Sequence, residues 1–186
     1  CPYYLGQELA RWADIVVGDY NHYFDLHAML HSLTQAQQWR AAALVDEAHN
    51  LLDRARGMYS AELSQHTFRH LRRTAPAPLK RPLERVYRLW QSLVKTQTAD
   101  YQPHDELPSA LLQALQHLVG AITDHLTEHP QATTDAALQG LYFDALHFTR
   151  VAELFSEHSM FDVRKEPPPP GSRGKANTVM CLRNLV

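Results

Sequence analysis

The chain has 186 residues, a formal net charge of −2 at pH 7 and a pI near 6.7. Its 45% hydrophobic and 20% charged residues are ordinary for a globular protein, and no apolar run approaches the roughly 20 residues of a membrane helix. We therefore expect a soluble, cytoplasmic protein with no membrane partner, in which any nucleic-acid binding depends on a local basic patch.

The first 58 residues combine helical and strand-like patterns. Residues 4–12 repeat apolar side chains at helical spacing, and the β-branched residues 15–17 predict a short buried strand. Residues 26–38 predict a helix, the apolar run 41–45 predicts a second strand, and a further helix is expected from about Glu47 to Gly57. A helix between two strands predicts a β-α-β crossover with parallel strands.

Two adjacent carboxylates, Asp46 and Glu47, follow the second of these predicted strands, and His49 comes two residues later. Ligands bind at the carboxyl edge of open α/β sheets, where such a pair can present an Asp for Mg²⁺ and a Glu that polarises water. The alternative is a solvated helix start that Asp46 merely caps. The complete Asp-Glu-Ala-His sequence favours ATP chemistry.

From residue 60 onward the pattern is mainly helical. Four segments with helical periodicity are separated by prolines, at 64–73, 78–99, 107–128 and 134–159. Their apolar stripes are typical of the core of a helix bundle. Residues 161–165 and 178–185 predict strands, and the proline-rich residues 166–174 predict a linker loop.

Strand-like segments near both ends of the chain, with helices between them, predict a mainly α fold in which a helical domain is inserted into a partial α/β lobe. We expect domain boundaries at 1–58, 59–160 and 161–186. Because the chain begins Cys-Pro-Tyr-Tyr without Met and ends within a predicted strand, we also expect a piece of a longer protein.

Basic residues are concentrated between positions 69 and 88, with Glu84 as the single acid. They are Arg69, Arg72, Arg73, Lys80, Arg81, Arg85 and Arg88. Such a surface can contact the phosphates of single-stranded DNA, with Tyr87 and Trp90 as stacking groups. The alternative is a solvated helix face with both aromatic side chains in the core.

The remaining candidates for metal or redox chemistry are weaker. The pairs His27/His31 and His125/His129 have a spacing compatible with a metal, but neither a His-Glu-x-x-His motif nor a cysteine pair accompanies them. Surface or hydrogen-bonded histidines are the better interpretation. Cys181 is expected to be a small buried hydrophobic residue.

Three segments in order resemble the iron–sulfur DEAH-box DNA helicases related to XPD and DinG. They are Cys1-Pro2-Tyr3-Tyr4, the segment from Ala13 to Asn21, and Val45 to Leu51 with its Asp46-Glu47-Ala48-His49 box. Together with the helical segments after the box, the resemblance covers essentially the whole chain. It implies a fragment that runs from the last cluster cysteine through the DEAH box and a helical arch domain.

In the parent enzyme the resemblance implies a role for each residue of these motifs. Cys1 would be one ligand of a [4Fe–4S] cluster, Asp46 would position Mg²⁺, Glu47 would activate the attacking water, and His49 would link the nucleotide state to the second motor lobe. The arch would guide single-stranded or forked DNA with 5′→3′ polarity, in DNA repair or replication, and could dock protein partners.

The sequence also departs from that family. A phosphate-binding loop of the Gly-x-Gly-Lys-Thr type and the other three cluster cysteines are missing from it, and a cluster needs four ligands. We therefore expect that the chain alone holds no ATP, Mg²⁺ or [4Fe–4S] cluster and is inactive as a helicase. The competing hypothesis is a non-catalytic helical module for protein interaction.

Overall fold

The structure is a computed structural model that describes residues 2–25, 28–130, 135–167 and 176–184. The chain divides into two compact units, Cys1–Tyr59 and Ser60–Val186, which are described separately. The predicted mainly helical fold is confirmed, and it is combined with a four-stranded antiparallel sheet.

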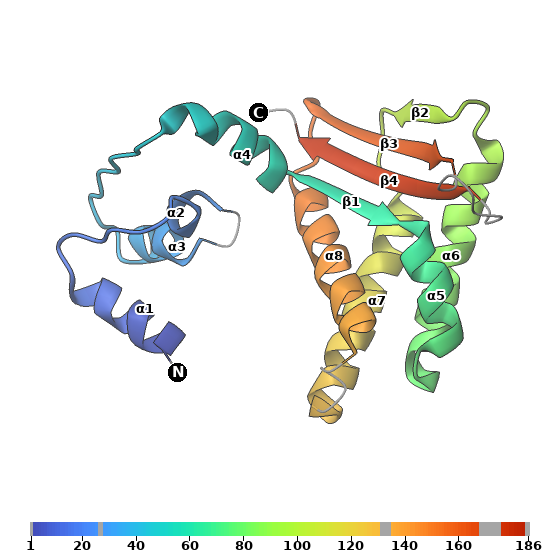
Figure 1. Ribbon diagram of the computed structural model, residues 1–186, viewed down its shortest axis with the longest axis horizontal. Helices are drawn as coiled ribbons and strands as arrows, with labels where there is room; N and C mark the ends of the chain where they lie inside the picture. The colour runs from blue at the N-terminus through green and yellow to red at the C-terminus, as the bar shows by residue number, and fades with distance from the viewer. Residues whose placement is uncertain (1, 26–27, 131–134, 168–175, 185–186) are drawn as a thin grey trace. The chain divides into compact units, whose positions relative to one another are not determined.

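The second unit consists of this sheet and four long helices (Figure 1). Its helices are α5 (Gln65–Thr74), α6 (Ala77–Thr96), α7 (Ser109–Glu128) and α8 (Ala136–Glu153). Its strands are β1 (Ser60–Ser64), β2 (Tyr101–His104), β3 (Ser159–Glu166) and β4 (Asn177–Asn184). The strand order is β1-β4-β3-β2, and the helices pack on one face of the sheet.

Side chains that alternate in direction along each strand give this sheet an inner face and an outer face. Ala61, Leu182 and Phe161 lie in one row across β1, β4 and β3, and all three are buried. The next row, Glu62 with Cys181 and Asp162, must point the opposite way because successive side chains of a strand alternate. The inner face therefore joins the apolar core against the helices, whereas the outer face carries polar groups.

The helical stripes predicted from the sequence form that core. On α6, the side chains of Leu79, Leu83, Val86 and Trp90 are fully buried, at the spacing of one helix face. Trp90 packs edge to face against Phe68 of α5, with 5.4 Å between ring centroids. The pair therefore packs α5 against α6.

All four helices predicted in this unit are confirmed, as are the strands at 161–165 and 178–185, although Leu185 lies outside the described residues. The last helix ends at Glu153, earlier than predicted, since β3 begins at Ser159. Most of the predicted linker, from residue 168 to 174, also lies outside the described residues. The return of 161–186 to a motor lobe stays a prediction.

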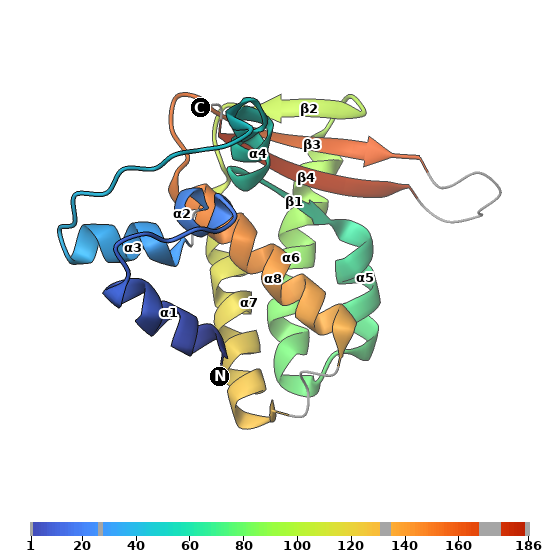
Figure 2. The ribbon, with the colours of Figure 1, turned by 60° about the vertical axis from the view of Figure 1, so that its left-hand side comes forward.

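The first unit contains shorter helices (Figure 2). They are α1 (Pro2–Trp12), α2 (Asn21–Phe24), α3 (Met29–Ala36), the 3₁₀ turn η1 (Ala48–Asn50) and α4 (Leu51–Met58). α3 contacts both α1 and α2. Tyr23 of α2 packs edge to face on His31 of α3, with 5.6 Å between ring centroids.

The prediction of strands at 15–17 and 41–45 was wrong, and so was the parallel β-α-β crossover built on them. Both segments are irregular, and their side chains are exposed except for the half-buried Val45, with Ile15 at 82%, Val17 at 93% and Leu44 at 101%. A strand requires a neighbour that accepts and donates its backbone hydrogen bonds. The described residues of the first unit contain no such partner strand.

Candidate nucleic-acid interface

The basic residues predicted between positions 69 and 88 converge on one groove between α5 and α6. Six of the seven line it, and its volume is about 860 Å³. We call it the basic groove and define it by its lining residues. These are Arg69, Arg72, Arg73, Lys80, Arg81, Glu84, Tyr87 and Arg88.

The amphipathic pattern of the two helices explains why these side chains share a face. On α5, Phe68 and Leu71 are buried, so that Arg69 and Arg72, which lie one position later in each case, turn away from the core at helical spacing. On α6, residues 80, 81, 84 and 88 alternate with the buried stripe in the same way. Because α5 and α6 pack on each other, their polar faces border the same groove.

Glu84 forms ion pairs with arginines of both helices. Its Oε2 accepts a hydrogen bond from Arg72 Nε at 2.7 Å, and Arg72 Nη2 lies 2.5 Å from the same oxygen. Its Oε1 lies 3.6 Å from Nε of Arg88. The side chains of Arg72 and Glu84 are 30% and 35% exposed, so their pair is partly shielded from solvent.

The two aromatic residues proposed as stacking groups have different environments. Trp90 is fully buried in the core, so its prediction as a stacking group was wrong. Tyr87 lines the groove, but the Arg72 guanidinium carbon lies 3.8 Å from its ring centroid. This cation–π contact covers one face of the ring and holds the guanidinium in place.

Three cations of the groove have neither an ion pair nor a side-chain hydrogen bond among the described residues. They are the exposed Arg73, Lys80 and Arg81. Arg69 is engaged differently, since its Nη1 donates to the Ala176 carbonyl at 3.2 Å and its Nη2 donates to Gln65 Oε1. The groove thus offers three uncommitted positive charges beside two that Glu84 already binds.

Arg85 does not join the basic groove. It borders a separate, smaller cavity with Arg88, Leu89 and Ala110 of α7. Its exposure leaves it free to contribute long-range attraction to an anion, but not a direct contact inside the groove.

The Asp-Glu-Ala-His box lies in an exposed turn of the first unit. Asp46 Oδ1 accepts a hydrogen bond from the Glu47 backbone N–H at 2.9 Å. His49 Nδ1 lies 3.2 Å from Glu47 Oε2, with the two side chains 73% and 66% exposed. Glu47 has φ of 51°, in the left-handed region, which is why the predicted helix from Glu47 begins instead as η1 and α4.

The structure brings no complete metal site together in its described part. No three His, Cys, Asp or Glu side chains converge there as metal ligands would. Asp46 and Glu47 supply carboxylate oxygens, but Mg²⁺ needs six ligands, usually completed by waters and substrate phosphates. Cys1 and His27 lie outside the described residues.

The second histidine pair is stacked on α7. The rings of His125 and His129 lie 4.8 Å apart at an angle of 29°. His125 is 8% exposed, and its Nδ1 is buried without a hydrogen-bond partner. The pair therefore contributes packing between successive turns.

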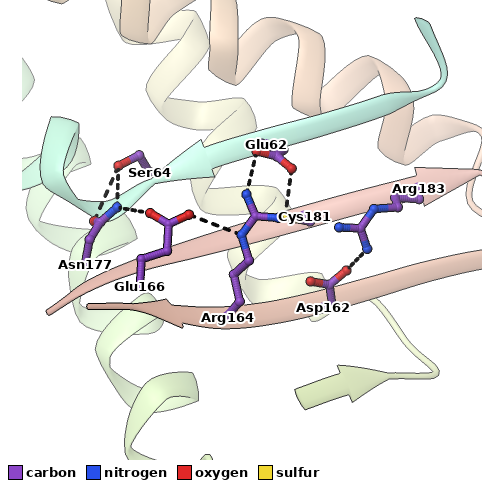
Figure 3. Close-up of polar contacts among 8 residues, drawn as sticks. All are labelled: Glu62, Ser64, Asp162, Arg164, Glu166, Asn177, Cys181 and Arg183. Carbon is purple, nitrogen blue, oxygen red and sulfur yellow. Dashed lines mark hydrogen bonds and ion pairs between the residues drawn. The ribbon is translucent and has the colours of Figure 1, made fainter. Parts of the chain in front are cut away.

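Sequence reasoning missed a polar network on the outer face of the sheet (Figure 3). Glu62 of β1 accepts hydrogen bonds from the Cys181 thiol at 3.3 Å and from Arg164 Nη2 at 3.0 Å. Burial, with the Glu62 hydrogen bond, raises the pKa of Cys181 to about 12. The expected burial of Cys181 is confirmed, but its partners are polar.

Three further polar contacts lie on the same face of the sheet. Asn177 Nδ2 donates to Glu166 Oε2 and to Ser64 Oγ, both at 3.1 Å. Arg183 donates to the fully buried Asp162. The β4 sequence Asn-Thr-Val-Met-Cys-Leu-Arg-Asn shows no clear polar alternation that predicts such a face, because Val179 and Cys181 occupy outward positions.

Comparison with known proteins gives a match for the first part of the chain. Residues 1–68 match the DEAD_2 family model. No curated protein matches the chain. Residues 69–186, which include the whole basic groove, lie outside the matched range. Within the described ranges, no helix is both long and apolar enough to cross a membrane.

Proposed function

We propose that the chain is part of an ATP-dependent DNA helicase related to XPD and DinG, and that the basic groove guides single-stranded DNA. The observation that carries the proposal is the convergence of six basic side chains on one groove, directly after the segment that matches the DEAD_2 model. Phosphate contacts of this kind bind single strands without sequence preference.

The cations of the groove differ in whether they are free to bind phosphate. Arg73, Lys80 and Arg81 are exposed and have no ion pair among the described residues, so they can bind a phosphate without first losing another partner. Arg69 is tied to the Ala176 carbonyl and shapes the border of the groove. Because the net charge of the chain is −2, attraction of DNA depends on this local field rather than on the whole molecule.

The motor residues keep their proposed roles in the parent enzyme. Asp46 holds Mg²⁺, Glu47 orients the attacking water and His49 transmits the nucleotide state. Cys1 is one ligand of the [4Fe–4S] cluster. These assignments depend on the Asp-Glu-Ala-His sequence and on the DEAD_2 match. The 5′→3′ polarity, a role in DNA repair or replication and a cytoplasmic location belong to the same proposal.

The test is the binding of a fluorescein-labelled oligodeoxythymidine, followed by anisotropy at several salt concentrations. The triple variant Arg73→Ala, Lys80→Ala, Arg81→Ala should weaken binding and flatten the salt dependence, by roughly 0.7 in log–log slope for each phosphate that the groove no longer neutralises. The matched control removes three exposed cations that lie outside the groove, Arg40, Lys95 and Arg150.

Equal losses in the triple variant and in its control would show that only net charge matters, and would contradict a guiding groove. Absence of any binding by the unmodified chain would favour the second candidate, a helical module for protein interaction. The observation that favours this candidate is the large apolar core that unit Ser60–Val186 has of its own.

A further inference from the structure

We infer that the carboxylate of Glu84 competes with phosphate for the arginines of the basic groove. The groove therefore binds a nucleic-acid backbone more weakly than it would without this carboxylate. The inference rests on the proposed function, because it assumes that the groove binds single-stranded DNA. It adds the residue that sets how tightly the groove binds.

The contacts of Glu84 are those that a phosphate would make. Arg72 directs both Nε and Nη2 to Glu84 Oε2, at 2.7 and 2.5 Å. A guanidinium binds phosphate oxygens through the same N–H groups. A phosphate can therefore contact this edge of Arg72 only after the carboxylate has been displaced.

Glu84 also pairs with an arginine of its own helix, α6. Arg88 Nε of α6 lies 3.6 Å from Glu84 Oε1, whereas Arg72 comes from α5. One carboxylate thus partly neutralises an arginine of each helix. Since Glu84 is the single acid among the lining residues, its replacement by Gln removes the only negative charge there.

Arg72 stays in the groove when Glu84 is replaced, because Tyr87 holds it independently. The guanidinium carbon lies 3.8 Å from the Tyr87 ring centroid, and such a contact is favourable on its own. The released N–H groups then remain directed into the groove. The partial shielding of the pair also limits the screening of its charges by salt.

The experiment compares Glu84→Gln with the unmodified chain in the same oligodeoxythymidine titration. The expected result is binding about three- to tenfold tighter at low salt, with a log–log salt slope that is steeper by roughly 0.7 for each additional phosphate neutralised. The control is Glu157→Gln, which makes the same charge change at a side chain that is 86% exposed and outside the groove. Its affinity should change less than twofold.

Circular-dichroism melting checks that each variant folds, and Glu84→Ala gives a second measure with the same expected direction. If the unmodified chain binds and the affinities of the folded Glu84 variants are unchanged or weaker, the inference is overturned while the proposed function stands. An equal gain in Glu157→Gln also overturns it. If neither the unmodified chain nor the Glu84 variants bind, the proposed function fails as well. Binding by the Glu84 variants alone supports the inference about Glu84 and contradicts DNA guidance by the unmodified groove.

Discussion

Asp162 and Arg183 illustrate how single residues maintain the outer face of the sheet. Asp162 has no exposed surface, and one of its oxygens lacks a partner in the described part of the chain. Arg183 of β4 binds the other oxygen from across the strand pair. A buried carboxylate is costly when its charge is not matched, so this arginine supplies the counter-charge that Asp162 needs within the β3–β4 pair.

Replacement of Arg183 by Gln should lower the free energy of unfolding by about 3–5 kcal/mol, because the carboxylate of Asp162 loses its counter-charge. Urea denaturation followed by circular dichroism measures this change. The double variant Asp162→Asn, Arg183→Gln should recover most of the loss, since no buried charge remains. A single variant as stable as the unmodified chain would show that Asp162 does not depend on the pair.

Cys181 should be unreactive in the native protein, because its thiol pKa is raised to about 12 by burial and by Glu62. In the Cys1→Ser variant, Ellman's reagent at pH 8 should detect no thiol until denaturant is added. The raised pKa favours the folded state fully below pH 9, the ordinary thiol value, and this contribution is lost as the pH rises toward 12. Rapid native labelling would contradict the buried position.

At the scale of the elements, α5 and α6 depend on one amphipathic contact. Their buried faces meet through Phe68 and Trp90, and their opposite faces make the basic groove. Core residues and charged residues thus lie on different faces of the same two helices. A substitution in the buried face should therefore affect the basic groove only if the helices unfold.

The variant Trp90→Ala should cost about 3–5 kcal/mol of unfolding free energy, as large aromatic truncations in a core do, and should remove the most blue-shifted part of the tryptophan emission. Trp12→Ala is the matched control. Its side chain is 86% exposed, and its replacement should change stability by less than about 0.5 kcal/mol. Similar costs for both would contradict the assignment of Trp90 to the core.

Helices were predictable from the sequence because their apolar spacing is local, as for Leu111, Leu115 and Leu118. The basic groove followed from the same spacing on two consecutive helices. Strands depend on distant partners, which is why β1 was missed and why 15–17 and 41–45 were wrongly predicted as strands. The pairing of Glu84 with Arg72, twelve positions apart, likewise depends on how two helices pack.

At the scale of the whole molecule, the two units differ in how much apolar surface they bury. The core of Ser60–Val186 includes four fully buried aromatic residues, Phe68, Trp90, Phe148 and Phe161. Among the described residues of the first unit, the buried apolar side chains are those of Ala10, Ala28 and Leu33. Apolar burial is the main source of stability. The cooperative transition in a thermal or urea denaturation curve should therefore come chiefly from the unfolding of the second unit.

The chain as it stands should show no Glu47-dependent ATP hydrolysis. Its Asp46-Glu47 pair lies in an exposed turn, and the sequence has no phosphate-binding loop of the Gly-x-Gly-Lys-Thr type to hold the triphosphate. Phosphate release in the presence of ATP and Mg²⁺ measures this, with Glu47→Gln as the control. A rate that is abolished in Glu47→Gln would contradict the prediction.

The pairing of β1 with β4 has a consequence for biosynthesis. Glu62 and Cys181 are 119 positions apart, and a ribosome adds about 5–20 residues each second. The β1 segment therefore waits on the order of 10 s for its partner, while the local contacts of α5 to α7 can already form. During that interval the β1 backbone has unpaired hydrogen-bonding groups, and the charge of Glu62 disfavours its pairing with a non-native strand.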